Sequence, residues 1–316
     1  MSQKHATLLV LACLIALSPL FFPSGYYFRI GALMFVNALA VTGIVILTGY
    51  AGQISLGHAG FAGIGGYACA LAPVHWGLHP ALAVVLGAAI SAGLAYLVGR
   101  PILRLKGYYL GVASLGFGIL VAMVLNNERW LTKGPDGIEV PDLGLRGLLK
   151  DWGLNLSNGE FWYGLTGIAL LIGAWLALNL YHSPTGRALR ALHGSEIAAG
   201  TVGIDVARVK LQAFVISAVY ASVAGSLLAL QNKFITPDVA GFMHSIEMVT
   251  MAVLGGAGSV PGAVIGAGIL TLLPQVLTVF ADYEQLILGL VMMLVMIFLP
   301  EGLVPSILRK FRGRGE

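Results

Sequence analysis

The chain has 316 residues, of which 58% are hydrophobic and 10% are charged, and its formal net charge is +4. Soluble domains typically carry about 25% charged residues, so this composition excludes an ordinary soluble protein and predicts an integral membrane protein surrounded by lipid. The basic residues cluster at the ends of apolar segments, as topology signals do, and we therefore expect no nucleic-acid partner. Cys13 and Cys69 both lie in apolar segments, where we expect packing and neither a disulfide nor a metal site.

Long apolar segments without charges repeat along the chain and predict membrane-spanning helices. A helix needs roughly 20 residues to cross the hydrocarbon core, whereas a β-barrel would show alternating segments of about ten residues. We therefore predict an all-α polytopic membrane protein, a single transmembrane domain over residues 1–316, with about ten spanning segments (8–10), two of them short or broken. The segments are 6–22, 30–49, 59–73, 81–99, 108–125, 161–181, 211–231, 246–256, 261–280 and 285–300. The two that are short for a full crossing are 59–73 and 246–256.

The first segment has one lysine and an apolar core, and thus resembles both a spanning helix and a cleaved signal peptide. No clean A-x-A cleavage site follows it, which favours the spanning helix.

The positions of lysine and arginine predict how the segments cross. Alternating crossings from a cytoplasmic amino terminus place twelve of the 18 basic residues inside and six outside, in agreement with the positive-inside rule. Both termini are then expected in the cytoplasm, with residues 126–160 as a long external loop and residues 183–210 as a cytoplasmic loop. The inside residues are Lys4, Arg100, Arg104, Lys106, Arg187, Arg190, Arg208, Lys210, Arg309, Lys310, Arg312 and Arg314, and the outside residues are Arg29, Arg129, Lys133, Arg146, Lys150 and Lys233.

The stretch Thr48–Tyr67 is rich in glycine and in polar side chains, although it lies in a run, Ile30–Gly99, without any Asp, Glu, Lys or Arg. Broken backbone at membrane depth exposes N–H and C=O groups that lipid cannot satisfy, so such a break must be buried in protein or line a wet cavity. The alternative is that the glycines only allow close helix packing, which is the role expected for Ala221 and Gly225. We favour a translocation pathway, although a lone histidine is more often structural than a ligand. The candidate pathway residues are Gly52, Gln53, Ser55, Gly57 and His58.

A second glycine-rich stretch, Leu254–Gly268, follows about 200 residues later, and its start resembles the first stretch. Paired short hydrophobic segments that are interrupted by Gly or Pro point to a transport pathway built from internal repeats. Gly255 and Gly256 are therefore pathway candidates as well. Glu247 is either a pathway carboxylate or a residue at the outer interface or a helix amino terminus, and the sequence leaves both readings open.

The cytoplasmic loop 183–210 predicts two short helices. Ser183 and Pro184 are typical of a helix start, and Ser195 can cap a second helix that Gly203 could end. This pair of helices is either a docking surface for another protein or an ordinary amphipathic loop at the membrane surface. We favour docking.

Four motifs occur in an order that resembles a known family. They are "GYAGQISLGHAGFAGIGGY", "TKGPDGI", "SPTGRALRAL…SEIAAGTVGIDVARVKLQAFVISA" and "MAVLGGAGSVPGAVIGA". Together they are similar to the LivM-type permease of branched-chain amino acid ABC importers, over about residues 30–305. The stretch "EIAAGTVG" resembles the family's coupling loop but departs by one residue from the EAA-x-x-x-G pattern of importer permeases.

The resemblance implies one of two dissimilar permease subunits in a bacterial inner membrane, beside a LivH-like second subunit. Two cytoplasmic ATPases would dock on loop 183–210, and a periplasmic binding protein would deliver substrate to loop 126–160. This chain would be no enzyme and would bind no cofactor itself, since the partner subunits would use the ATP. The implied ATPase-coupling residues are Arg187, Arg190, Glu196 and Gly203, and the implied external contacts are Lys133, Pro135 and Asp136.

The residues support part of this assignment independently. No G-x-x-x-x-G-K-[ST] phosphate loop occurs in the chain, so an ATPase that drives transport must be another protein. One alternative within the same architecture is a permease for urea or short-chain amides. Another is a secondary transporter or channel that works without ATP, but no series of buried Asp, Glu and His indicates a proton path. An intramembrane enzyme is disfavoured because no nucleophile–base spacing is present.

Overall fold

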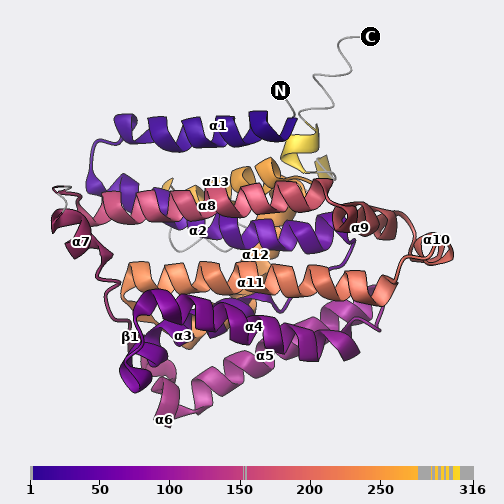
Figure 1. Cartoon of the computed structure of the whole chain (residues 1–316), viewed down its shortest axis with the longest axis horizontal. Helices are drawn as coiled ribbons and strands as arrows, with labels where there is room; N and C mark the ends of the chain where they lie inside the picture. The colour runs from indigo at the N-terminus through magenta and orange to yellow at the C-terminus, as the bar shows by residue number, and fades with distance from the viewer. Residues whose placement is uncertain are drawn as a thin grey trace.

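The computed structural model describes residues 3–276, apart from Trp152 and Leu154, and scattered positions between 286 and 306. This part of the chain is almost entirely helical, and the all-α prediction is confirmed (Figure 1). The helices are α1 (Gln3–Leu17), α2 (Gly25–Val45, continued by a π-helical turn, Ile46–Tyr50), α3 (His58–Trp76), α4 (Pro80–Ile102), α5 (Tyr108–Asn127), α6 (Arg129–Thr132), α7 (Leu145–Asp151), α8 (Asn158–His182), α9 (Pro184–Gly194), α10 (Glu196–Thr201), α11 (Val206–Asn232), α12 (Phe242–Gly255) and α13 (Val260–Val276).

Nine of the ten predicted segments fall on described helices, namely α1 to α5, α8 and α11 to α13, and most of the tenth, 285–300, lies outside the described residues. Within the described part of the chain, five helices are long and apolar enough to cross a membrane: α2 with its π-helical turn, α4, α5, α8 and α11. Helix α3 is longer than the predicted segment 59–73, because it continues through Pro73 to Trp76 and has 19 residues, whereas α12 is short with 14 residues.

Helix ends are set by capping groups that hydropathy does not detect. Ser157 and Glu160 form a capping box that starts α8 three residues before the predicted segment. The Asp205 side chain accepts a hydrogen bond from the Arg208 N–H and starts α11 at Val206, five residues before the predicted segment.

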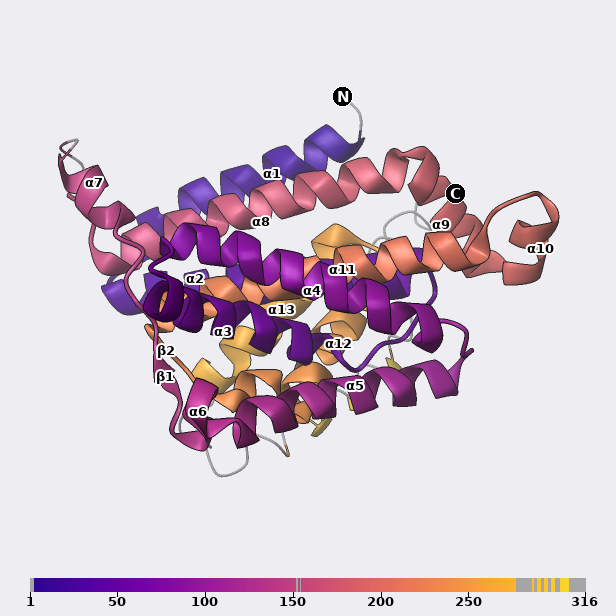
Figure 2. The same ribbon diagram turned by 60° about the horizontal axis from the view of Figure 1, so that its bottom comes forward.

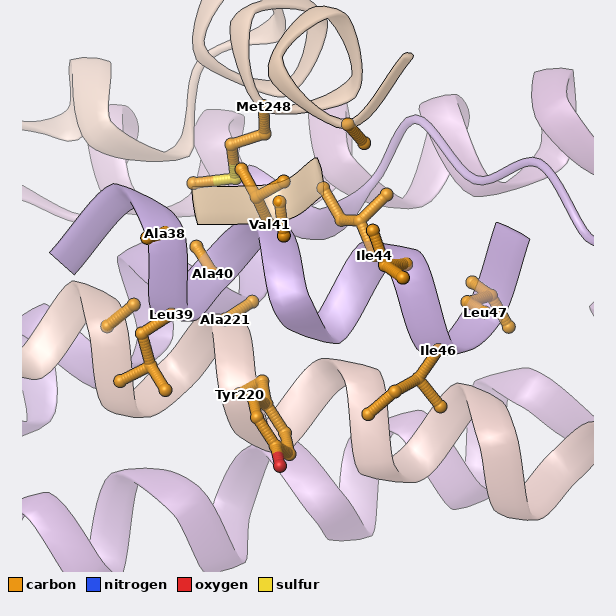
Figure 3. Packing of buried hydrophobic residues seen from close by; sticks show 14 of the residues in the cluster. Ala38, Leu39, Ala40, Val41, Ile44, Ile46, Leu47, Tyr220, Ala221 and Met248 are labelled. Atoms are coloured by element: carbon orange, nitrogen blue, oxygen red, sulfur yellow. The ribbon is translucent and has the colours of Figure 1, made fainter. Parts of the chain in front are cut away.

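Helices α2 and α11 form the centre of the molecule. The spanning window of α2 is 78% buried and that of α11 is 72% buried, whereas the windows of α4 and α5 are only 22% and 28% buried. Residues of α2 and its π-helical turn, from Ala38 to Leu47, pack there with Tyr220 of α11 and Met248 of α12 (Figure 3). The exposed apolar faces of α4 and α5 are therefore available to lipid or to another subunit.

Close backbone contact joins α3 to α11. A Cβ added at Gly65 would lie 2.0 Å from the Ser222 carbonyl oxygen, and one added at Gly225 would lie 2.0 Å from the Ala62 carbonyl oxygen. The packing role expected for Gly225 is thus confirmed, and only glycine lets these two helices approach so closely.

The connecting segments gather at two opposite ends of the helix bundle (Figures 1 and 2). One end carries α6, α7 and a two-stranded antiparallel sheet of β1 (Ile138–Glu139) and β2 (Phe234–Ile235), in which Ile138 pairs with Ile235. The other end carries α9 and α10. Loops 126–160 and 183–210 therefore lie at opposite ends, as two sides of a membrane require.

Candidate translocation site and its connection to the α9–α10 hairpin

The first glycine-rich stretch contains a helix break. The π-helical turn after α2 ends at Tyr50, residues 51–57 are not helical, and α3 begins at His58. Gly52 has φ +66, a left-handed conformation that favours glycine. The Gln53 N–H donates to the Leu47 carbonyl oxygen at 3.1 Å, which closes the end of α2.

Helix α5 holds the broken segment from the side. The Leu56 N–H donates to Ser114 Oγ at 3.0 Å. A Cβ added at Gly57 would lie 2.3 Å from the Ser114 carbonyl oxygen, so the close approach requires glycine. The freed backbone of the break is therefore partly satisfied by protein, as a break at membrane depth must be.

The polar side chains of this break are buried. His58 is 1% exposed, and its Nε2 lies 2.7 Å from Ser217 Oγ on α11. Because the Ser217 hydroxyl donates to the Phe214 carbonyl oxygen at 3.0 Å, the network assigns the proton between the two side chains to His58 Nε2. His58 Nδ1 then remains a buried acceptor with no hydrogen-bond partner among the described residues.

Gln53 is the least satisfied polar residue of the break. It is 3% exposed, and neither its amide nitrogen nor its amide oxygen has a hydrogen-bond partner in the described part of the chain. Buried polar groups are nearly always paired, so an unpaired amide requires a partner such as water or a bound molecule. Ser55 is also buried, and its Oγ lies 3.5 Å from the Gly57 backbone nitrogen.

The second glycine-rich stretch contains a tighter break, between Gly255, which ends α12, and Val260, which begins α13. Gly256 has φ +108. A Cβ added at Gly255 would lie 1.8 Å from the Gly262 carbonyl oxygen, and one added at Gly266 would lie 1.9 Å from the Met251 carbonyl oxygen. The two helices therefore pack backbone against backbone, and both predicted breaks are present.

The two breaks touch each other. A Cβ added at Gly49, in the turn before the first break, would lie 1.7 Å from the carbonyl oxygen of Ala257, inside the second break. Helix α3, which follows the first break, is also joined to α12, which precedes the second break, because the Ala59 N–H donates to Ser245 Oγ at 3.2 Å. The fold thus brings the two glycine-rich stretches to one place.

Glu247 lies apart from the contact between the two breaks. Its side chain is 54% exposed and its carboxylate lies 3.4 Å from His244 Nδ1 on the same helix. Gly255 is eight residues further along α12, which corresponds to about 12 Å of helix rise. Glu247 is therefore an exposed residue in the first half of α12, and both of its predicted roles stay predictions.

Loop 183–210 forms the predicted hairpin of two capped helices. Ser183 Oγ accepts a hydrogen bond from the Gly186 N–H at 3.0 Å, with Pro184 at the first helical position, and Ser195 Oγ accepts from the Ala198 N–H at 3.3 Å. Gly203, with φ +88, lies two residues after Thr201, the last residue of α10. These local predictions are confirmed.

The hairpin has a buried face and an exposed face. Leu189 and Leu192 of α9 point into the protein and are buried, whereas Arg187 and Arg190 are exposed. On α10 and just after it, Ile197 is 78% exposed and Val202 is 76% exposed. These two exposed aliphatic side chains give the outer face of the hairpin apolar contact area.

A stack of side chains connects α9 to the first break. The Arg190 guanidinium lies 4.1 Å from the centre of the Tyr181 ring, and that ring lies 5.0 Å from the ring of Tyr50. Gly52 packs against His193, since a Cβ at Gly52 would lie 3.2 Å from His193 Nδ1. A displacement of α9 would therefore act directly on the break.

An ion pair connects α10 to α11. Glu196 binds Lys210, whose side chain is only 5% exposed. Helix α11 also carries Ser217, the partner of His58. Sequence reasoning selected Arg190 and Glu196 but missed Tyr50, Tyr181 and Lys210, although aromatic and basic residues at the ends of apolar helices are a signal that could have indicated them.

The predicted external contacts lie on an ordered surface. Lys133, Pro135 and Asp136 are all exposed, in the turn between α6 and β1. Thr132 fixes this turn because its hydroxyl donates to the carbonyl oxygens of Leu125 and Glu128. Among the described residues, no group of three or more His, Cys, Asp and Glu side chains could hold a metal ion.

A helix bundle with two broken segments in contact, and with a capped hairpin at one end, defines a polytopic membrane protein of the permease class. The family described as branched-chain amino acid transport system / permease component matches residues 26–296, and the chain belongs to this family. The resemblance to LivM-type permeases is thereby confirmed.

Individual relatives agree with the family. The chain is 34% identical to the high-affinity branched-chain amino acid transport system permease protein LivM of Salmonella typhimurium, over 83% of this chain and 66% of the relative. It is 32% identical to LivM of Escherichia coli, over 96% of this chain and 75% of the relative. It is also 29% identical to LivH of Salmonella typhimurium, over 84% of this chain and 90% of that protein. No solved structure matches the chain.

Proposed function

We propose that this chain is one of two permease subunits of an ATP-driven importer for branched-chain amino acids in a bacterial inner membrane. The proposal rests on the family membership together with one structural observation, the connection of the α9–α10 hairpin to the first helix break. The similarity to both LivM and LivH supports a second permease subunit as partner.

The energy for transport would come from two separate ATPase subunits that dock on α9 and α10. The exposed Ile197 and Val202 provide apolar contact area, and Arg187 and Arg190 provide charge. Movement of the hairpin would pass to the first break through Arg190, Tyr181 and Tyr50. It would also pass to α11 through the Glu196–Lys210 ion pair, while Gly203 lets the chain turn between α10 and α11.

The translocation pathway would lie where the two breaks meet. The candidate residues of the first break are Gly52, Gln53, Ser55, Gly57 and His58, and those of the second are Gly255 and Gly256. The substrate would be a zwitterion with an apolar side chain, for which broken backbone supplies N–H groups to the carboxylate and carbonyl groups to the ammonium. The unpaired amide of Gln53 is the side chain best placed to join these contacts.

The orientation that we propose rests on the positive-inside count of Lys and Arg and on the placement of the two loop clusters at opposite ends. We propose that α9 and α10 lie in the cytoplasm, together with both termini, and that the α6–β1 end faces the periplasm. A substrate-binding protein would then contact Lys133, Pro135 and Asp136. Alternating access requires different affinities in the two states, which nucleotide and this binding protein would supply.

The proposal is tested by purification and uptake. The full chain is tagged, extracted with a mild detergent and analysed for co-purifying ATPase subunits, and sealed vesicles that contain the complex are assayed for ATP-dependent leucine uptake. A secondary transporter would take up leucine without ATP and without such subunits. A urea or amide permease would instead take up urea, and excess unlabelled urea, but not excess leucine, would reduce that uptake.

A further inference from the structure

A groove of about 1380 Å³ opens beside the first turns of α11, at the end of the molecule that carries α9 and α10. Leu211, Val215 and Ile216 of α11 line it with half-buried apolar side chains. The last turn of α4 forms one rim, and the ends of α8 and α10 contribute to the other. The groove thus has an apolar wall that belongs to membrane-spanning helices.

The rim of this groove is strongly basic. It contains five cations and two carboxylates, which gives a net charge of +3 (5 − 2). Lys210 is neutralised by Glu196, and Asp205 caps α11. Within the described residues, Arg100, Arg104, Lys106 and Arg208 have no carboxylate at ion-pair distance.

Arg100 is held in position on the rim. Its guanidinium lies 4.3 Å from the centre of the Tyr96 ring, one turn earlier on α4, and it donates a hydrogen bond to the Tyr96 hydroxyl. A guanidinium that is already ordered loses less side-chain entropy on binding, and its planar fork matches the geometry of a phosphate.

We infer that this groove binds one anionic phospholipid of the cytoplasmic leaflet, with the headgroup phosphate against the basic rim and an acyl chain along the α11 wall. Basic pockets between spanning helices at the cytoplasmic surface suit anionic headgroups. A soluble anion would leave the apolar wall unused, and a protein partner would have to supply several acidic groups at the membrane surface. The inference rests on the proposed orientation, which puts the groove in the inner leaflet.

The test uses the full chain, extracted with its partners and examined by native mass spectrometry with equal amounts of phosphatidylglycerol and phosphatidylcholine. We expect one phosphatidylglycerol to be retained in preference to phosphatidylcholine. The double variant Arg100→Gln/Arg104→Gln should bind it roughly 25-fold more weakly, because each cation near an anionic surface contributes about fivefold. The control Arg129→Gln/Arg146→Gln removes the same charge from the opposite end and should bind normally.

A second variant keeps both arginines and places a carboxylate on the rim. Ala207 lines the groove, is exposed and lies in the first turn of α11, where an acidic residue stabilises the helix. Ala207→Glu should therefore fold and yet lose phosphatidylglycerol, whereas Ala207→Gln should keep it. Equal retention of the lipid by Ala207→Glu and wild type would overturn the inference.

A crosslinker separates lipid from protein as the occupant. Gln212, exposed in the groove, is replaced by a benzophenone amino acid and irradiated in whole membranes. A lipid adduct supports the inference, and a polypeptide adduct in its place overturns it. Co-purifying ATPase is scored on the same preparations. Wild-type protein that co-purifies with ATPase but without lipid would overturn only the lipid site. Protein that retains the lipid but no ATPase would overturn only the proposed function.

Discussion

The two helix breaks have similar sequences at their start but are built differently. The first is a seven-residue segment, 51–57, that carries Gln53 and Ser55 and touches the α9–α10 hairpin through Gly52. The second, between Gly255 and Val260, is a short turn held by backbone contacts to Gly262. Glycine therefore serves two purposes. In the first break it allows a non-helical segment with polar side chains, and in the second it allows close packing of the backbone. If this comparison is right, substitutions in the second break should mainly affect stability, and substitutions in the first should mainly affect transport.

The largest effect is expected at the point where the breaks meet. Gly49→Ala places a Cβ 1.7 Å from the Ala257 carbonyl oxygen and forces both backbones apart. We expect a loss of about 3 kcal/mol in the free energy of unfolding, as in severe overpacking. Thermal unfolding of the detergent-solubilised protein measures it. The control Gly93→Ala lies on the open face of α4, with nothing within 4 Å of its Cβ, and should be neutral or stabilising. Equal stability of Gly49→Ala and wild type would contradict the close contact between the two breaks.

A smaller loss of stability is expected for Gly256→Ala. The residue has φ +108, a conformation that a residue with a Cβ adopts only with strain of about 2 kcal/mol. Its partner experiment is Gly52→Ala, at φ +66, where the added Cβ meets His193. We expect Gly256→Ala to lower the unfolding temperature, and Gly52→Ala to slow leucine uptake more than it lowers stability. The reverse pattern would contradict the division between the breaks.

Among the contacts described above, those that reach the α9–α10 hairpin come from the first break. Glu196→Gln leaves Lys210 without its partner, and Arg190→Gln removes the cation over the Tyr181 ring. We expect both variants to stay folded. The free energy of unfolding should fall by about 1 kcal/mol, because Glu196 is partly exposed. Both should hydrolyse ATP in the complex while leucine uptake falls. Parallel assays of hydrolysis and uptake measure this uncoupling, and normal coupling in both variants would argue strongly against the docking role.

The smallest effect on stability is expected at Gln53. Gln53→Leu removes an amide that has no partner among the described residues, so stability should change by less than about 1 kcal/mol. Uptake should nevertheless fall if the amide contacts substrate or pathway water. Ser217→Ala is the matched comparison, because it removes a hydroxyl that is bonded to His58 and should cost stability first. Normal uptake by a stable Gln53→Leu protein would exclude a role for this amide in transport.

Local features of the protein were predictable because they depend on neighbours in sequence. Hydropathy located nine helices within the described residues, and the caps Ser183 and Ser195 predicted the hairpin. The two breaks were detectable because glycine and polar side chains interrupt charge-free segments. The length of α3 was not, since a helix that continues through Pro73 depends on packing against α11 and α4.

Sequence by itself determined an all-helical membrane protein with two glycine-rich breaks and a capped helical hairpin, because apolar length, glycine and caps act within a few residues. Only the tertiary structure decided which of these features meet. Gly49 reaches Ala257, Arg190 reaches Tyr50 through Tyr181, and Glu196 reaches Lys210. Such contacts depend on how helices distant in sequence pack and on which side chains that packing turns toward one another, and no local pattern records either.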